Sequence, residues 1–272
     1  LVRAPVTLCA ALFLALLVAI PATATPDGFL EAWFLYEQGK AKMDSPGGGE
    51  LGEALLLFAQ AIDKRGGAFP EAELAIGDIS RAEGAFAMAE QQYNKAWEQR
   101  GGLEIPEERY TVLYRLAELA EMQDKYGDME KQLLRIVADQ PYFSAAQHAN
   151  LRDALKSTYL EKGLDQSFRL YRLEDVGFAA EAHSRLGWLF YRTGRYDSGS
   201  SGAVTHLLFA LDIAITEMVL ELRRVEPDYV FTTLEDFLAR AAKRPNVAEY
   251  MREGLRQVGA PLLLLVRDPE QR

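Results

Sequence analysis

Cysteine is almost absent from this sequence, since Cys9 is the only one among 272 residues. It lies in an N-terminal segment that we expect to be removed, so the mature chain would have neither a disulfide bond nor a catalytic thiol. Cys9 also precedes the apolar run 10–20, whereas a lipoprotein acceptor cysteine should follow such a run. We therefore expect a protein without cysteine chemistry and without a lipid anchor.

Histidines and catalytic motifs are scarce too. His148, His183 and His206 lie in different predicted helices, and none has a metal-binding spacing such as HxxxH or HExxH. The sequence has no Gly-x-Ser-x-Gly elbow, no Cys/His pair and no dinucleotide-binding glycine pattern. Its many carboxylates are scattered as solvated helix faces would be, whereas acid–base catalysis requires two of them in one partly desolvated site. We therefore predict a non-enzymatic protein without a metal or a cofactor.

Clusters of basic residues are missing as well. The chain has 30 basic and 40 acidic residues, which gives a formal net charge of -10. Arg223, Arg224 and their neighbours are too few to form a basic patch, and a chain this acidic repels phosphate backbones. Nucleic acids and anionic membrane surfaces are therefore not expected as partners.

The N-terminus has the features of an export signal. Arg3 is the only early charge, residues 10–20 are apolar, and Ala22-Thr23-Ala24 matches a small-x-small cleavage site. About 11 apolar residues are fewer than the roughly 20 that span a bilayer, so the run does not favour an uncleaved anchor. We predict a signal peptide over 1–24, cleavage after Ala24, and a periplasmic or secreted mature protein without membrane association.

Alternating β-branched runs are few, and from Phe29 onward apolar residues recur at intervals of three and four, which predicts an all-α protein. Prolines such as Pro70 and Pro106 stand where one helical pattern has ended and another begins, which suits a first helical position. The glycine-rich segments 45–49 and 197–202 lack the phosphate-loop spacing and are interpreted as insertion loops within helical pairs. The predicted helices are 29–43, 50–64, 71–86, 87–99, 107–123, 128–139, 144–162, 165–173, 179–192, 203–225, 232–243 and 247–257.

A triplet of small, bulky and small residues returns in register along the chain. The second copy lies 35 positions after the first, and a fixed period in this range is typical of stacked helical hairpins. Small residues let two helix backbones approach, and the bulky residue fills the remaining gap. The three copies are Ala54, Phe58, Ala61; Ala89, Tyr93, Ala96; and Ala203, Leu207, Ala210.

The triplet resembles the tetratricopeptide repeat, whose unit has 34 residues. The unit with Ile76-Gly77 in its first helix fits best, whereas those around Gly39 and Leu186-Gly187 need short insertions. A unit through Leu116-Ala117 is apolar where the family prefers alanine, and one around Tyr159 departs most. The resemblance implies a right-handed superhelical solenoid of antiparallel helix pairs over 25–225, followed over 226–272 by C-terminal capping helices and a tail.

In this family partners usually lie in a concave groove lined by the first helix of each pair. An aromatic and mixed-charge lining suits an extended peptide or an amphipathic helix, although a helical aromatic can equally belong to the core. Carried over by position, the expected groove residues are Trp33, Tyr36, Leu74, Asp78, Arg81, Tyr114, Glu118, Glu121, Trp188, Tyr191 and Arg192.

Signal and repeats together predict a non-enzymatic adaptor of the bacterial cell envelope that holds a protein or peptide partner in its groove. The alternative is a small-molecule-binding accessory of an uptake system, with an apolar pocket formed by the apolar helix 203–225. A third hypothesis is a structural role in envelope assembly through self-association of the convex face.

Overall fold

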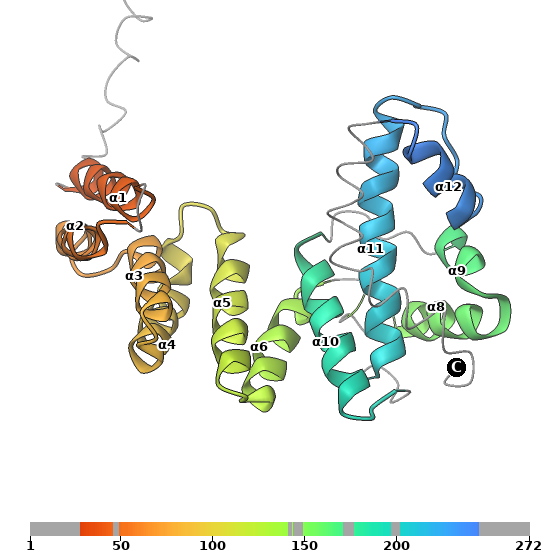
Figure 1. Cartoon of the computed structure of the whole chain (residues 1–272), viewed down its shortest axis with the longest axis horizontal. Helices are drawn as coiled ribbons and strands as arrows, with labels where there is room; N and C mark the ends of the chain where they lie inside the picture. The colour runs from red at the N-terminus through yellow and green to blue at the C-terminus, as the bar shows by residue number, and fades with distance from the viewer. Residues whose placement is uncertain are drawn as a thin grey trace, which may run out of the picture.

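A computed structural model describes residues 28–45, 49–140, 143, 149–170, 177–196 and 202–244. All regular structure in these ranges is helical, which confirms the all-α prediction (Figure 1). The α-helices are α1 (Phe29–Met43), α2 (Leu51–Lys64), α3 (Pro70–Ala82), α4 (Phe86–Glu98), α5 (Glu108–Met122), α6 (Tyr126–Ala138), α8 (Ala149–Lys162), α9 (Leu164–Leu170), α10 (Ala180–Arg192), α11 (Ala203–Arg223) and α12 (Leu234–Ala241). Two short 3-10 helices, η1 (Arg100–Gly102) and η3 (Gly177–Ala179), precede α5 and α10.

The helix bounds follow the sequence pattern closely, with one clear error. The prediction of a single helix over 71–86 is wrong, because α3 ends at Ala82 and Phe86 already belongs to α4. Gly84 has a φ of 76° in the intervening turn, a left-handed conformation that glycine adopts without steric cost and that ends a right-handed helix. The expected signal peptide over 1–24, His148, the helix 247–257 and the C-terminal tail lie outside the described residues.

In three helical pairs, α1–α2, α3–α4 and α10–α11, a glycine of the first helix lies against a bulky residue of the second. A Cβ atom added at Gly77 would lie 2.5 Å from the Tyr93 ring, and one at Gly187 would lie 2.4 Å from the Leu207 side chain. A Cβ atom added at Gly39 would lie 2.6 Å from the Phe58 ring. All nine residues of the repeated triplets are buried, as the sequence predicted.

The pairs follow one another in space in an order that differs from the sequence. In Figure 1 the pairs α1–α2, α3–α4, α5–α6 and α10–α11 stand in a row, and α10 packs directly on α6. Helices α8 and α9 lie on the far side of α11, with α8 packed against it. The segment around Tyr159, which departs most from the repeat pattern, therefore lies beside the row and not between the third and the last pairs. Tyr159 is buried beside α11 in the large C-terminal core instead.

Helix α11 is the centre of that C-terminal core. Within the described residues it is the one helix long and apolar enough to cross a membrane by length and composition, but 83% of the relevant window is buried inside the protein. Sixteen of its residues are buried, Asp212 among them. The apolar character of α11, which motivated the pocket of the alternative function, is thus accounted for by packing against the protein's own side chains.

Candidate partner-binding face

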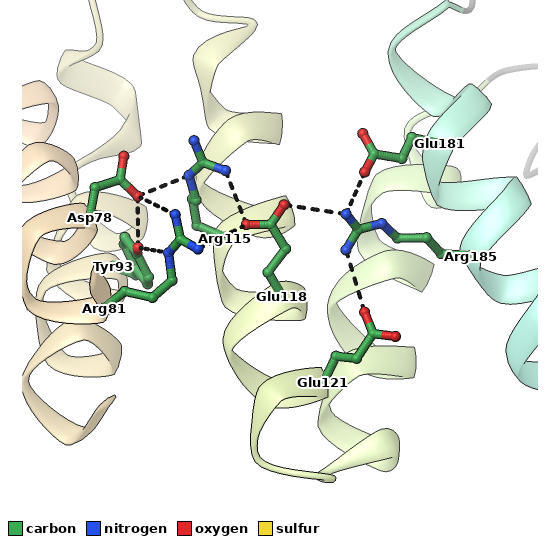
Figure 2. Close-up of polar contacts among 8 residues, drawn as sticks. All are labelled: Asp78, Arg81, Tyr93, Arg115, Glu118, Glu121, Glu181 and Arg185. Carbon is green, nitrogen blue, oxygen red and sulfur yellow. Dashed lines mark hydrogen bonds and ion pairs between the residues drawn. The ribbon is translucent and has the colours of Figure 1, made fainter. Parts of the chain in front are cut away.

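The first helices of three neighbouring pairs are joined by a chain of ion pairs, which we call the charge ladder (Figure 2). Asp78 of α3 lies 2.9 Å from the Arg115 guanidinium of α5, and Arg115 lies 3.0 Å from Glu118 on the same helix. Glu118 continues the chain to Arg185 of α10, at 3.3 Å. The members of the charge ladder are Asp78, Arg81, Arg115, Glu118, Glu121, Glu181, Arg185 and Arg192.

The pairing repeats from one unit to the next. An arginine of a first helix meets the acid on the first helix of the preceding pair, as Arg115 meets Asp78 and Arg185 meets Glu118. Arg115 stands three residues before Glu118, and Arg185 stands three residues before Trp188. The position that holds an acid in the second and third pairs therefore holds a tryptophan in the last, and the regular alternation ends there.

The charge ladder is neutral although the whole chain is acidic. It contains four carboxylates and four guanidinium groups, and the side chains that bear them are between 24% and 52% exposed. Burial lowers the pKa of Arg115, but the Asp78 and Glu118 carboxylates outweigh burial and raise it overall. The opposite charges of the ladder therefore balance, and the ladder offers no excess of either sign to a partner.

A buried tyrosine anchors the ladder at its α3 end. The Tyr93 hydroxyl donates a hydrogen bond to Asp78 over 2.8 Å and accepts one from the Arg81 Nε over 3.2 Å. Burial and then the Asp78 carboxylate raise the pKa of Tyr93, which keeps this hydroxyl protonated and able to donate. The bulky residue of the second triplet thus links core packing to the polar face.

Tyr114 has a structural role and is not a free aromatic platform. Its hydroxyl donates a hydrogen bond to the Phe178 carbonyl over 2.7 Å and accepts one from the Ala182 backbone N–H over 3.0 Å. These bonds tie α5 to the N-terminal end of α10. The hydroxyl of Tyr114, a residue expected to line the groove, is therefore already satisfied within the fold and is not offered to a partner.

The aromatic residues expected to line the first unit lie partly in its core. The Trp33 and Tyr36 rings pack against Phe69 with centroid distances of 4.9 and 5.3 Å, and Tyr36 also contacts Phe58. Both remain half-buried. Leu74 is likewise half-buried and packs against the core between α4 and α5. These three side chains therefore contribute to packing and stay only partly exposed to a partner.

A hollow of about 240 Å³ opens where the regular ladder ends. Its lining combines the Trp188 ring and Met129 with Arg185, Arg192 and Glu121. Arg192 is held by a single long ion pair, 3.9 Å from Glu121, and its side chain is 52% exposed. The hollow thus brings an aromatic ring, an apolar side chain and an accessible guanidinium together.

Further aromatic rings contact two residues of the hollow, Trp188 and Arg192. Tyr191 packs edge-on against Trp188 at 6.1 Å and against Tyr196 at 5.2 Å. Arg192 lies over the Tyr126 ring at 5.8 Å. Tyr126 and Tyr196 are exposed, which extends the aromatic surface from α10 to the start of α6.

The structure therefore divides the expected groove residues into three groups. Asp78, Arg81, Glu118 and Glu121 join the charge ladder, and Trp188, Tyr191 and Arg192 lie at or beside the hollow. The remaining expected residues contribute to packing or to hydrogen bonds within the fold, namely Trp33, Tyr36, Leu74 and Tyr114. Sequence reasoning missed Arg115 and Arg185, although their common spacing of three residues before the next groove position was a usable signal.

A second polar group lies deep in the core, away from this face. His183 and His206 are fully buried, and their Nδ1 atoms are 2.8 Å apart. The Nε2 atom of His183 contacts the Gln140 amide oxygen, which can only accept, so His183 carries its proton on Nε2 and accepts from His206 at Nδ1. Within the described part of the chain no group of three or more His, Cys, Asp or Glu residues is placed to hold a metal ion.

Comparisons with known proteins identify one relative of undefined role. The chain is 31% identical over 196 residues to an uncharacterized protein of Treponema pallidum (strain Nichols), an alignment that covers 70% of this chain and 50% of that protein. The chain thus spans about half the length of this relative. No protein-family model matches the sequence, and no solved structure matches it.

Proposed function

We propose that this chain is a tetratricopeptide-like helical solenoid that acts as a non-enzymatic adaptor in the bacterial cell envelope. In this proposal a peptide or helical segment of a partner protein docks on the first-helix face and anchors an apolar side chain in the hollow beside Trp188. The row of four helical pairs, three of which set a glycine against a bulky side chain, supports the repeat assignment. The expected export signal supports the cellular location.

The observation that carries the proposal is the composition of the hollow. Tryptophan, tyrosine and arginine dominate the binding energy of protein interfaces, because they bury a large area for the conformational entropy they lose. Here Trp188 and Arg192 line the hollow and Tyr191 packs against Trp188. Arg192 has one long ion pair of 3.9 Å, whereas Arg185 is held by three carboxylates. A partner would therefore gain most of its affinity at this end of the face.

Site-specific photocrosslinking in the cells that make the protein identifies the partner. A photoreactive amino acid at position 188 is expected to capture one defined protein. The matched control carries the same amino acid at Leu56, an apolar side chain of α2 that is 65% exposed and belongs to no hollow described here. Capture from position 56 but not from position 188 would count against the proposal.

Affinity measurements with the purified partner then test the anchor. We expect Trp188→Ala to weaken binding at least about tenfold, the size of a moderate interface hot spot. Leu56→Ala should leave the dissociation constant unchanged, and circular dichroism should show native helicity for both variants. An unchanged dissociation constant for folded Trp188→Ala would refute the assignment of the hollow.

A further inference from the structure

The charge ladder stops before it reaches the first helical pair. In α5 and α10 an arginine pairs with the acid of the preceding unit, but α3 has the buried Ala75 at the corresponding position. On α1 the acid itself is replaced, because the position that corresponds to Asp78, directly after the packing glycine, holds Lys40. In the part of the chain that the structure describes, no ion pair links α1 to α3. The first-helix face therefore ends at α1 without the pairing that neutralises the rest of it.

Glu71, in the first turn of α3, is a buried acid at this end of the face. Only 4% of the residue is exposed. Its Oε1 atom accepts a hydrogen bond from the Glu104 backbone N–H over 2.8 Å, which places the carboxylate beside the connection that leads into α5. The Oε2 atom is buried as well and has no hydrogen-bond partner among the described residues. Leaving a buried acceptor unpaired costs free energy, which a donor from another molecule can recover.

A second acid and a tyrosine lie close to Glu71. Glu108 is the first residue of α5 and Tyr36 belongs to α1, and both are half-buried. Burial and then the Glu71 carboxylate raise the pKa of Glu108, whereas Lys40 acts in the opposite direction. Burial, then Glu108 and Glu71, also raise the pKa of Tyr36, and Glu37 adds to this effect. The Glu71 charge thus acts on both α1 and α5, which places it toward the space between these helices.

The balance of charge at this end is acidic. We call Tyr36 together with Glu37, Glu71 and Glu108 the acidic end of the first-helix face. Against its three carboxylates stands Lys40, whose Nζ atom lies 5.8 Å from the centroid of the Tyr36 ring. The described residues contain no group of three or more His, Cys, Asp or Glu side chains placed to hold a metal ion. A lysine ammonium or an arginine guanidinium suits such spaced carboxylates better, because its several N–H donors point in different directions.

We propose that the acidic end binds a lysine or arginine side chain of the partner segment. The cation contacts the half-buried Glu108 and Tyr36 side chains, and the covered Glu71 charge attracts it through the weakly screening interior. In Figure 1 the helices α1 and α10 belong to the two outer pairs of the row. A segment bound along the face therefore has its basic residue near α1 and its apolar anchor beside Trp188.

The basic contact fixes the direction of the segment, because charge complementarity contributes more to orientation and specificity than to affinity. This use of the acidic end rests on the proposed function. The affinity of the acidic end for a cationic side chain, in contrast, is a property of the free protein and can be measured without the partner.

A hexalysine peptide with blocked ends is the probe. We expect isothermal titration calorimetry at about 0.05 M KCl to show binding to the wild-type protein, where screening is weak. Glu108→Gln and Glu71→Gln should each weaken this binding at least about threefold. The matched control is Glu235→Gln, which removes an exposed acid from the first turn of α12, as Glu108→Gln removes an acid from the first turn of α5.

Equal effects of Glu108→Gln and Glu235→Gln would overturn the proposal, because the peptide would then respond only to the negative charge of the whole chain. Absence of hexalysine binding to the wild type would overturn it too. Glu71→Gln keeps an oxygen for the Glu104 N–H, and if this variant fails to fold by circular dichroism, Glu108→Gln decides alone. Trp188→Ala should bind hexalysine as the wild type does, so that failure of the hollow and failure of the acidic end are seen separately.

Discussion

At the scale of single residues, the buried pair His183 and His206 makes stability depend on pH. Burial and then the neighbouring His206 hold the pKa of His183 well below its ordinary value. The unfolded chain, where histidine has a pKa of about 6.5, therefore binds this proton more readily than the folded protein does. A second proton on His183 would also set two N–H donors against each other at the 2.8 Å contact.

We accordingly expect stability to be complete above about pH 6.5 and to fall as the pH drops below it, by up to about 1.4 kcal/mol per pH unit for one proton. Urea denaturation at pH 7.5 and at pH 5.5 measures the change. His183→Gln should be less stable than wild type at both pH values, because the packed ring is lost. Its free energy of unfolding should nevertheless fall less than that of wild type from pH 7.5 to pH 5.5. An equal loss in wild type and variant would contradict this role of His183.

At the scale of helices, the close approach of α3 and α4 depends on the missing side chain of Gly77. A methyl group there would meet the Tyr93 ring at 2.5 Å, and the same ring holds Asp78 through its hydroxyl. We expect Gly77→Ala to lower the free energy of unfolding by about 1 to 3 kcal/mol through overpacking. Urea denaturation followed by circular dichroism measures this loss.

The matched control for this substitution is Gly127→Ala in α6. Gly127 is also helical, but no atom lies within 4 Å of the added Cβ. The control should leave stability unchanged or raise it by up to about 1 kcal/mol, since alanine favours the helix over glycine. Equal destabilisation by both substitutions would show that the Gly77–Tyr93 contact has no special part in joining the two helices.

Most helices could be read from the sequence, because an amphipathic period of three to four residues is a local property. The pairing partners of the ladder could not be. Arg115 pairs with Asp78 of the preceding helical pair in the sequence. Arg185 pairs with Glu118 because α8 and α9 lie outside the row, so that α10 packs on α6. That departure depends on tertiary packing against α11, which no local pattern encodes. Repeat position thus indicated that Trp188 lies on this face, but it did not indicate the hydrogen bonds that Tyr114 makes to the start of α10.

At the scale of the whole molecule, the buried apolar residues are unevenly distributed. The largest core cluster joins α5 and α6 to α8, α10, α11 and α12, whereas the first pair contributes to a small cluster shared only with α3 and its preceding residue Phe69. In arrays of neighbouring repeats a terminal unit with one neighbour opens more easily than a unit packed on several sides. The stability of the chain should therefore rise from the α1–α2 pair toward α11.

Native-state hydrogen exchange resolves this gradient. We expect the amides of α1 and α2 to exchange at lower opening free energy than those of α11, with α3 and α4 in between. Leu30 and Phe34, which are 71% and 63% exposed on α1, indicate how little of the first pair is covered. Uniform protection from α1 to α11 would mean that the chain unfolds as one cooperative unit, contrary to this expectation.

The packing of α10 on α6 also has a consequence for synthesis on the ribosome. Roughly 40 residues separate the end of α6 from the start of α10. At about 5 to 20 residues per second, the ribosome therefore begins α10 some 2 to 8 seconds after it has finished α6. Helix α6 contains Leu133, Ile136 and Val137, which are all buried in the folded protein. Until α10 and α11 have been synthesised, these apolar side chains are open to a chaperone or to another nascent chain on the same messenger RNA.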